Sequence, residues 1–74
     1  MREKGYRFFF FSREEPRMHV HITCAEGEAK YWLDPGISLV KNHNLPGTQL
    51  KDIENIIEAH YDEFRQAWNN HFGN

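Results

Sequence analysis

Cysteine is nearly absent from this sequence: Cys24 is alone among 74 residues, which excludes an internal disulfide. A chain of this length has room for one domain, residues 1–74, and buries only about 60% of its unfolded surface. The single cysteine fits a reducing compartment. Such a domain depends on aromatic packing, a bound metal or a partner chain for its stability.

Long apolar runs and a large excess of charge of one sign are also missing. No stretch approaches the roughly 20 apolar residues of a membrane span, and the apolar stretch after Arg7 is too short for a signal peptide. We therefore expect a cytoplasmic protein with no membrane partner. The formal net charge is −2, so nucleic acid is a partner that the net charge does not indicate.

Aromatic residues are abundant, at 15%, and supply the large buried areas that so short a chain needs. Residues 6–11 are rich in strand formers, and residues 18–24 alternate between apolar and polar side chains. A turn at Glu26 and Gly27, where glycine tolerates a positive φ, leads to a strand at 28–33. Residues 37–40 form a short further strand. We predict an α+β fold with a three- to four-stranded antiparallel sheet followed by a C-terminal amphipathic helix.

The turn determines which side chains share a face of the central hairpin. Any loop with an even number of residues places Ala29, Tyr31 and Leu33 on the same face as Val20 and Ile22. The opposite, polar face then carries His19, His21, Thr23, Glu28, Lys30 and Trp32.

A helical period follows Thr48, which we expect to be the N-cap, and Gly73 is expected to be the C′ glycine. We expect His60, at the edge of the apolar stripe, to hydrogen-bond the backbone. The stripe consists of Leu50, Ile53, Ile57, Tyr61, Phe64, Trp68 and Phe72.

The length of this stripe exceeds that of the sheet. One unbroken helix would be about 34 Å long, whereas a six-residue strand spans about 20 Å. Two arrangements follow. Either the helix bends into two near residues 59–62, or its Trp68 and Phe72 end packs on a second copy in a homodimer.

Four segments of the sequence resemble the bacterial family known as domain of unknown function 4160. The Pro-x-x-His-x-His pattern is the most specific of them, although Pro16-Arg17-Met18 stands where members typically show two prolines or a proline and a small residue. The resemblance implies a small intracellular prokaryotic domain whose gene neighbours another small domain in a toxin–antitoxin-like pair. The segments are GYRFFF (5–10), EPRMHVH (15–21), GEAKYWL (27–33) and EFRQAW (63–68).

His19 and His21 point the same way from one strand, about 7 Å apart at the backbone. Such a pair is a candidate site for a divalent transition metal if His43, Asp34, Glu15 or a histidine of a second chain supplies a third ligand. Otherwise the two imidazoles are structural, and no cofactor is expected.

The same face offers the groups of a metal-independent ribonuclease. His19 and His21 would act as general base and acid, and Lys30 would stabilise the charged phosphorane. Arg17 is a candidate phosphate contact, and Trp32 is a candidate platform for a stacked base unless the chain's own loop covers it.

No motif fixes such an activity, so our leading interpretation is a non-enzymatic protein-interaction module, for which one partner of a toxin–antitoxin-like pair is the role that the family resemblance implies. It would bind a small protein partner through an exposed sheet edge and the histidine face. A sheet edge, or the Trp68 and Phe72 end of the helix, is the candidate homodimer contact.

Overall fold

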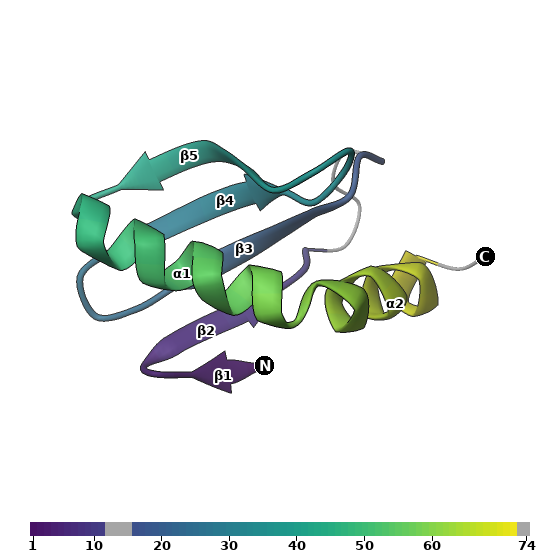
Figure 1. Cartoon of the computed structure of the whole chain (residues 1–74), viewed down its shortest axis with the longest axis horizontal. Coiled ribbons are helices and arrows are strands. Elements are labelled where there is room, and N and C mark those ends of the chain that lie inside the picture. Colours follow the sequence, from purple (N-terminus) through teal and green to yellow (C-terminus); the bar gives the residue numbers. More distant parts are fainter. Residues whose placement is uncertain (12–15, 73–74) are drawn as a thin grey trace.

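The computed structural model describes residues 1–11 and 16–72 and contains one antiparallel sheet followed by two helices (Figure 1). The strands follow one another in the order β1-β2-β3-β4-β5, so each pairs with its neighbour in the sequence. The elements are β1 (Arg2–Glu3), β2 (Tyr6–Phe9), β3 (His19–Thr23), β4 (Glu28–Trp32), β5 (Ser38–His43), α1 (Gly47–Ala59) and α2 (Tyr61–Phe72).

The sheet has five strands, so the predicted number of three to four is wrong. The missed strand is β1, whose two residues are too few to show an alternation. Lys4 and Gly5 form the tight connection to β2, with φ angles of 52° and 85°. Two successive positive φ angles are typical of a type I′ hairpin turn. The Lys-Gly pair was the one local signal for this hairpin.

The central hairpin has the predicted parity. Thr23 pairs with Glu28 and His21 with Lys30, so four residues form the loop between β3 and β4. Gly27 lies in this loop but does not adopt a positive φ, contrary to the expected reason for a glycine. A Cβ atom on Gly27 would instead collide with the carbonyl oxygen of His43 at the end of β5. The glycine is needed because two backbone segments approach closely there.

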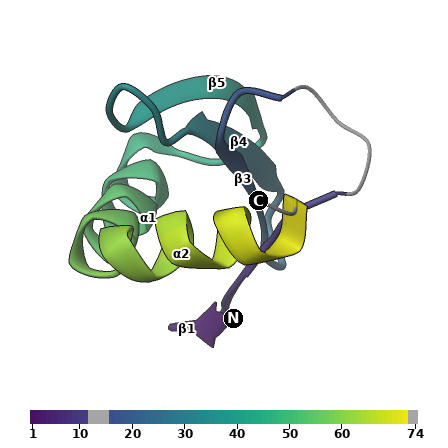
Figure 2. The ribbon, with the colours of Figure 1, turned by 90° about the vertical axis from the view of Figure 1, so that its right-hand side faces the viewer.

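Both helices pack on one face of the sheet, and the view turned by 90° shows this layering (Figure 2). At the centre of the core, the hydroxyl of Tyr31 donates a hydrogen bond of 2.9 Å to Glu54 of α1. No helix in the described part of the chain is long and apolar enough to cross a membrane. The buried hydrophobic residues of the core are Tyr6, Phe8, Val20, Ile22, Ala29, Tyr31, Leu33, Leu45, Ile53, Ile56, Ile57, Phe64 and Trp68.

The helical stripe bends at His60, one of the two arrangements that the sequence allowed. The hydroxyl of Tyr61 donates to the carbonyl of Leu33 at the end of β4, which ties the bend to the sheet. The expected N-cap is wrong: Thr48 lies inside α1, which begins at Gly47 without a side-chain cap. The expected C′ glycine, Gly73, lies outside the described residues.

The second helix extends the core past the end of β2. Trp68 is 7% exposed, and its ring lies 5.4 Å from Phe10 and 5.0 Å from His19 between centroids. Phe72 packs beside it, 4.0 Å from the Trp68 ring. The chain itself therefore largely covers this end of the stripe, for which a second copy was one of the two predicted arrangements.

Candidate functional site

The face of the sheet opposite the helices, here called the outer face, holds the residues that the sequence singled out. Strand pairing arranges them in rows that cross the sheet. Directly opposed residues point to the same side, so each row lies on one face. The central row is Phe9, His21, Lys30 and Lys41, the row on one side is Arg2, Arg7, Thr23, Glu28 and His43, and the row on the other is His19, Trp32 and Ser38.

His19 differs from the expected exposed imidazole, because it is completely buried. Its Nδ1 lies 2.7 Å from the carbonyl oxygen of Arg17. A carbonyl only accepts, so this nitrogen carries the proton and donates it. The imidazole ring also contacts the ring of Trp68, a residue of α2 that packs against the start of β3. His19 is thus built into the packing, and it is not presented to a ligand on the outer face as an acid or base would be.

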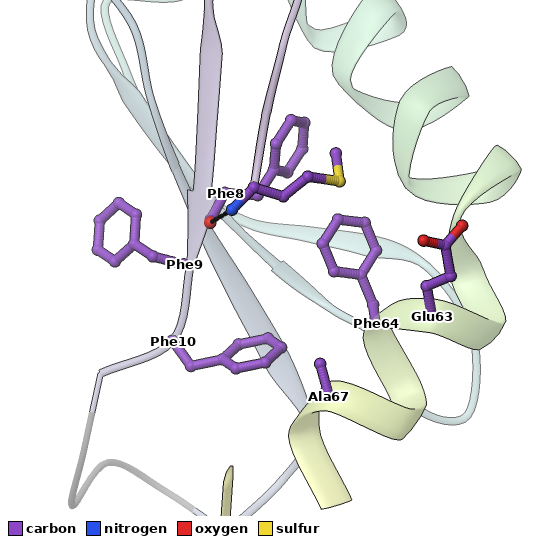
Figure 3. Close-up of a pocket in the computed structure, with 7 residues that line it drawn as sticks. Phe8, Phe9, Phe10, Glu63, Phe64 and Ala67 are labelled. Carbon is purple, nitrogen blue, oxygen red and sulfur yellow. Dashed lines mark hydrogen bonds between the residues drawn. The ribbon is translucent and has the colours of Figure 1, made fainter. Parts of the chain in front are cut away.

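His21 is half-buried and belongs to a cluster of rings on the outer face. It stacks on Phe9 with 5.7 Å between ring centroids and lies 4.4 Å from Phe11. Phe11 is 48% exposed, so the cluster opens to solvent on that side. The close-up shows Phe9 directed away from Phe8 and Phe10, which point toward the helices (Figure 3).

Trp32 lies under two cations, which the sequence did not predict. The guanidinium carbon of Arg17 is 4.2 Å from the indole centroid, and the ammonium nitrogen of Lys30 is 4.9 Å from it. Arg17 is held there because its Nε donates a 2.9 Å hydrogen bond to the carbonyl of Asp34. The structure therefore brings together both candidate binding residues, Arg17 and Trp32, beside Lys30.

Like charges stand opposite each other at two places on the outer face. Arg2 pairs with Arg7 between β1 and β2, and Lys30 pairs with Lys41 between β4 and β5. Like charges in directly opposed positions are destabilising. Glu28 is the one carboxylate in the rows of the described strands. Basic side chains therefore outnumber acidic ones in the described strand rows of this face, although the whole chain carries a net charge of −2.

A hollow of about 430 Å³ lies in this basic region, between the ring cluster and β5. Phe11 and His21 line one side, and Lys30, Val40 and Lys41 line the other. Val40 reaches it because a β-bulge shifts the register of β5 between its pairs with Lys30 and Tyr31. Sequence reasoning missed Val40 and Lys41, since a bulge breaks the alternation on which it relied.

The proposed metal ligands do not assemble in the described part of the chain. No group of three His, Cys, Asp or Glu side chains there could hold an ion. His43 lies in the outermost row opposite Glu28, two residues along β5 from the position level with His21. Glu15, another suggested ligand, lies outside the described residues.

A second hollow, of about 420 Å³, lies between β2 and α2 and is mainly apolar (Figure 3). Phe8 and Phe64 form its floor, with 5.5 Å between their ring centroids. Glu63 stands at its margin and is the one acidic residue among those that line it. No titratable pair converges inside this hollow, so it offers shape and apolar surface but no acid–base chemistry.

A histidine with charged partners lies at the helix bend, away from the outer face. His60 Nδ1 is 2.8 Å from Glu63, and His60 Nε2 is 2.9 Å from Glu3 of β1. The expected partner was the backbone, so this prediction is wrong. Hydrogen bonds from Glu63 and then Glu3 raise the pKa of His60 above its ordinary value, because carboxylates accept from both ring N–H groups of the imidazolium.

Comparison with known proteins gives one match. The sequence profile of the family described as Domain of unknown function (DUF4160) matches residues 5–69, which include all of the outer-face residues except Arg2. No curated protein and no solved structure matches the chain.

Proposed function

Since this chain belongs to the family described as Domain of unknown function (DUF4160), we propose for it the role of a protein-interaction module that binds an extended segment of a partner protein along β5. Pairing with an exposed sheet edge is a recurring mode of peptide recognition, in which main-chain hydrogen bonds supply affinity. The companion in a toxin–antitoxin-like pair would be such a partner.

The exposure of β5 is the observation that supports this proposal. It is the last strand of the sheet and pairs with β4 alone among the described strands. All six of its residues are exposed. Leu39 and Val40 are 43% and 40% exposed, which gives the edge an apolar part for a partner to cover.

The edge favours a different protein over a second copy of this chain. The bulge at Val40 and the charge of Lys41 are devices that disfavour pairing between identical edges. If two copies of the chain paired in antiparallel fashion through β5, Lys41 of one copy would lie near Lys41 of the other. A partner strand with an acidic residue at that position would turn the same charge into an attraction.

Hydrogen exchange on the complex tests this proposal. The chain would be co-expressed with the product of the adjacent gene, purified as a complex and compared with the free chain. We expect the amides of β5 to exchange more slowly in the complex. Absence of a complex, or protection confined to α1 and α2, would overturn the proposal.

A variant pair separates the edge from general effects of surface charge. Val40→Glu adds a repulsive charge to an exposed edge position and should abolish the complex. Asn55→Glu adds the same charge at an exposed position of α1 and should leave the complex intact. Equal behaviour of the two variants would show that β5 is not the contact.

A further inference from the structure

The outer face of the sheet carries aromatic rings with cations beside them. The proposed contact along β5 makes no use of these rings. We propose that this face binds single-stranded nucleic acid, with the rings stacking on bases and the cations contacting phosphates. This inference goes beyond the interaction module and does not depend on it.

Two groups of accessible rings lie on this face. Between centroids, Phe9 lies 5.0 Å from Phe11, and Phe11 lies 4.4 Å from His21. Trp32 lies beyond the buried His19, whose ring is 5.2 Å from His21 and 5.8 Å from Trp32 and is not itself accessible to a base. An open antiparallel sheet with aromatic side chains on its face is a common platform for unstacked bases, since every base has a π face.

Each group of rings has a guanidinium beside it. The guanidinium carbon of Arg7 is 5.0 Å from the Phe9 ring, and that of Arg17 is 4.2 Å from the Trp32 ring. A guanidinium over a ring can extend a stacking surface and contact a phosphate as well. Each group therefore offers a stacking surface and a phosphate contact side by side.

The opposed arginines favour a polyanion as the ligand. Arg2 faces Arg7 on the outer face. This pair costs free energy in the unliganded protein, and the repulsion is relieved when an anion lies between the charges. The net charge of −2 does not oppose such binding, because a local basic region sets the potential that a strand meets.

The hollow beside the Phe11 ring is suited to a base. It measures about 430 Å³ and is lined by Phe11, by Lys30 and Lys41 and by one carboxylate, that of Glu28. The ring would accept a base, and the two lysines, which outnumber the carboxylate, would accept its phosphate. An acidic protein segment would satisfy the cations but would have no group to stack on Phe11, so the rings favour nucleic acid.

Fluorescence anisotropy with labelled homopolymers tests the proposal. The probes are an oligouridylate and an oligothymidylate of about ten nucleotides, with labelled polyglutamate as a polyanion control. We expect both oligonucleotides to bind and their affinity to fall between about 50 and 200 mM salt, with a log–log slope of about −0.7 per phosphate contact. Tighter binding of the uridylate would identify RNA as the ligand, and the reverse would identify DNA.

Two variants separate stacking from charge. Phe11→Leu keeps apolar volume but removes the flat ring, and should weaken binding at least about fivefold with an unchanged salt slope. Arg7→Gln should weaken binding and make the slope about 0.7 shallower. Lys51→Gln removes a charge from an exposed position of α1 and should change neither.

The proposal would be overturned by an absence of oligonucleotide binding. It would also be overturned if polyglutamate bound as tightly and Phe11→Leu had no effect, because the face would then recognise acidic protein segments. Phe11 and Arg7 are both exposed, and circular dichroism of each variant would confirm that the fold is intact. A Leu39→Glu variant adds the charge to an exposed residue of β5 that does not line the hollow, so it should still bind the oligonucleotides while it weakens the β5 contact, which separates the two surfaces.

Discussion

His60 at the helix bend and Glu3 in the first strand are in contact, with 2.9 Å between Nε2 and Oε1, although 57 positions separate them in the sequence. Glu63 holds the other ring nitrogen at 2.8 Å. The contact ties the short β1 to the junction of α1 and α2. A two-residue edge strand has few hydrogen bonds of its own, so this ion pair is an important attachment.

Stability should therefore depend on pH through His60. Its pKa in the folded chain is raised above the ordinary 6.5 by Glu63 and Glu3. The folded state then binds the proton more tightly than the unfolded state does. The stabilisation is fully present below about pH 6.5 and is lost as pH rises through the raised pKa. Urea unfolding at a series of pH values between about 6 and 8 measures this loss.

His60→Gln should flatten that part of the pH profile. Glu3→Gln should reduce the pH dependence and also speed hydrogen exchange in β1, because it removes the partner from that strand. Glu63→Gln should reduce the pH dependence without the effect on β1. A profile that is unchanged by His60→Gln would contradict this account.

Gly27→Ala should destabilise the protein by about 1–3 kcal/mol, because the added methyl group collides with the backbone of His43 and must displace it. Thermal unfolding measures the loss. Gly36→Ala is a matched control, since a Cβ at Gly36 would meet nothing within 4 Å. An equal loss in both variants would mean that glycine flexibility, and not the close approach, explains the effect.

Tyr31→Phe should cost about 1.5–3 kcal/mol, because the buried hydroxyl donates to the carboxylate of Glu54. Burial, together with this carboxylate, raises the pKa of Tyr31, so the hydroxyl stays protonated and donating at neutral pH. Chemical denaturation measures the cost. If Tyr31→Phe cost as much in a Glu54→Ala background as in the wild-type chain, the hydrogen bond to Glu54 would not be the cause.

His19→Ala should destabilise the chain more than His21→Ala. His19 is fully buried, and its removal leaves a cavity under Trp68 and takes the donor from the Arg17 carbonyl, for a loss of about 2–4 kcal/mol. His21 is half-buried, so its truncation leaves a smaller cavity. Comparison of denaturation midpoints is the measurement, and a larger loss for His21→Ala would show that His19 is not the structural member of the pair.

Part of the site was readable from the sequence because alternation is a local property. A strand exposes successive residues on opposite faces, and an even loop preserves the phase, so His21 and Lys30 had to share a face. The helical stripe was readable for the same reason. Its excess length over the sheet then restricted the chain to two arrangements, and the bend at His60 is one of them.

The α+β class, the phase of the central hairpin and the apolar face of the helices follow from the order of the amino acids alone. The contacts of Trp68 with His19, of Arg17 with Trp32 and of Glu3 with His60 became visible only in the folded chain. The two sets differ in the range of the interactions that determine them. Side-chain phase follows from backbone geometry within a few residues, whereas these contacts depend on where the bent helix meets the sheet, which no local period encodes.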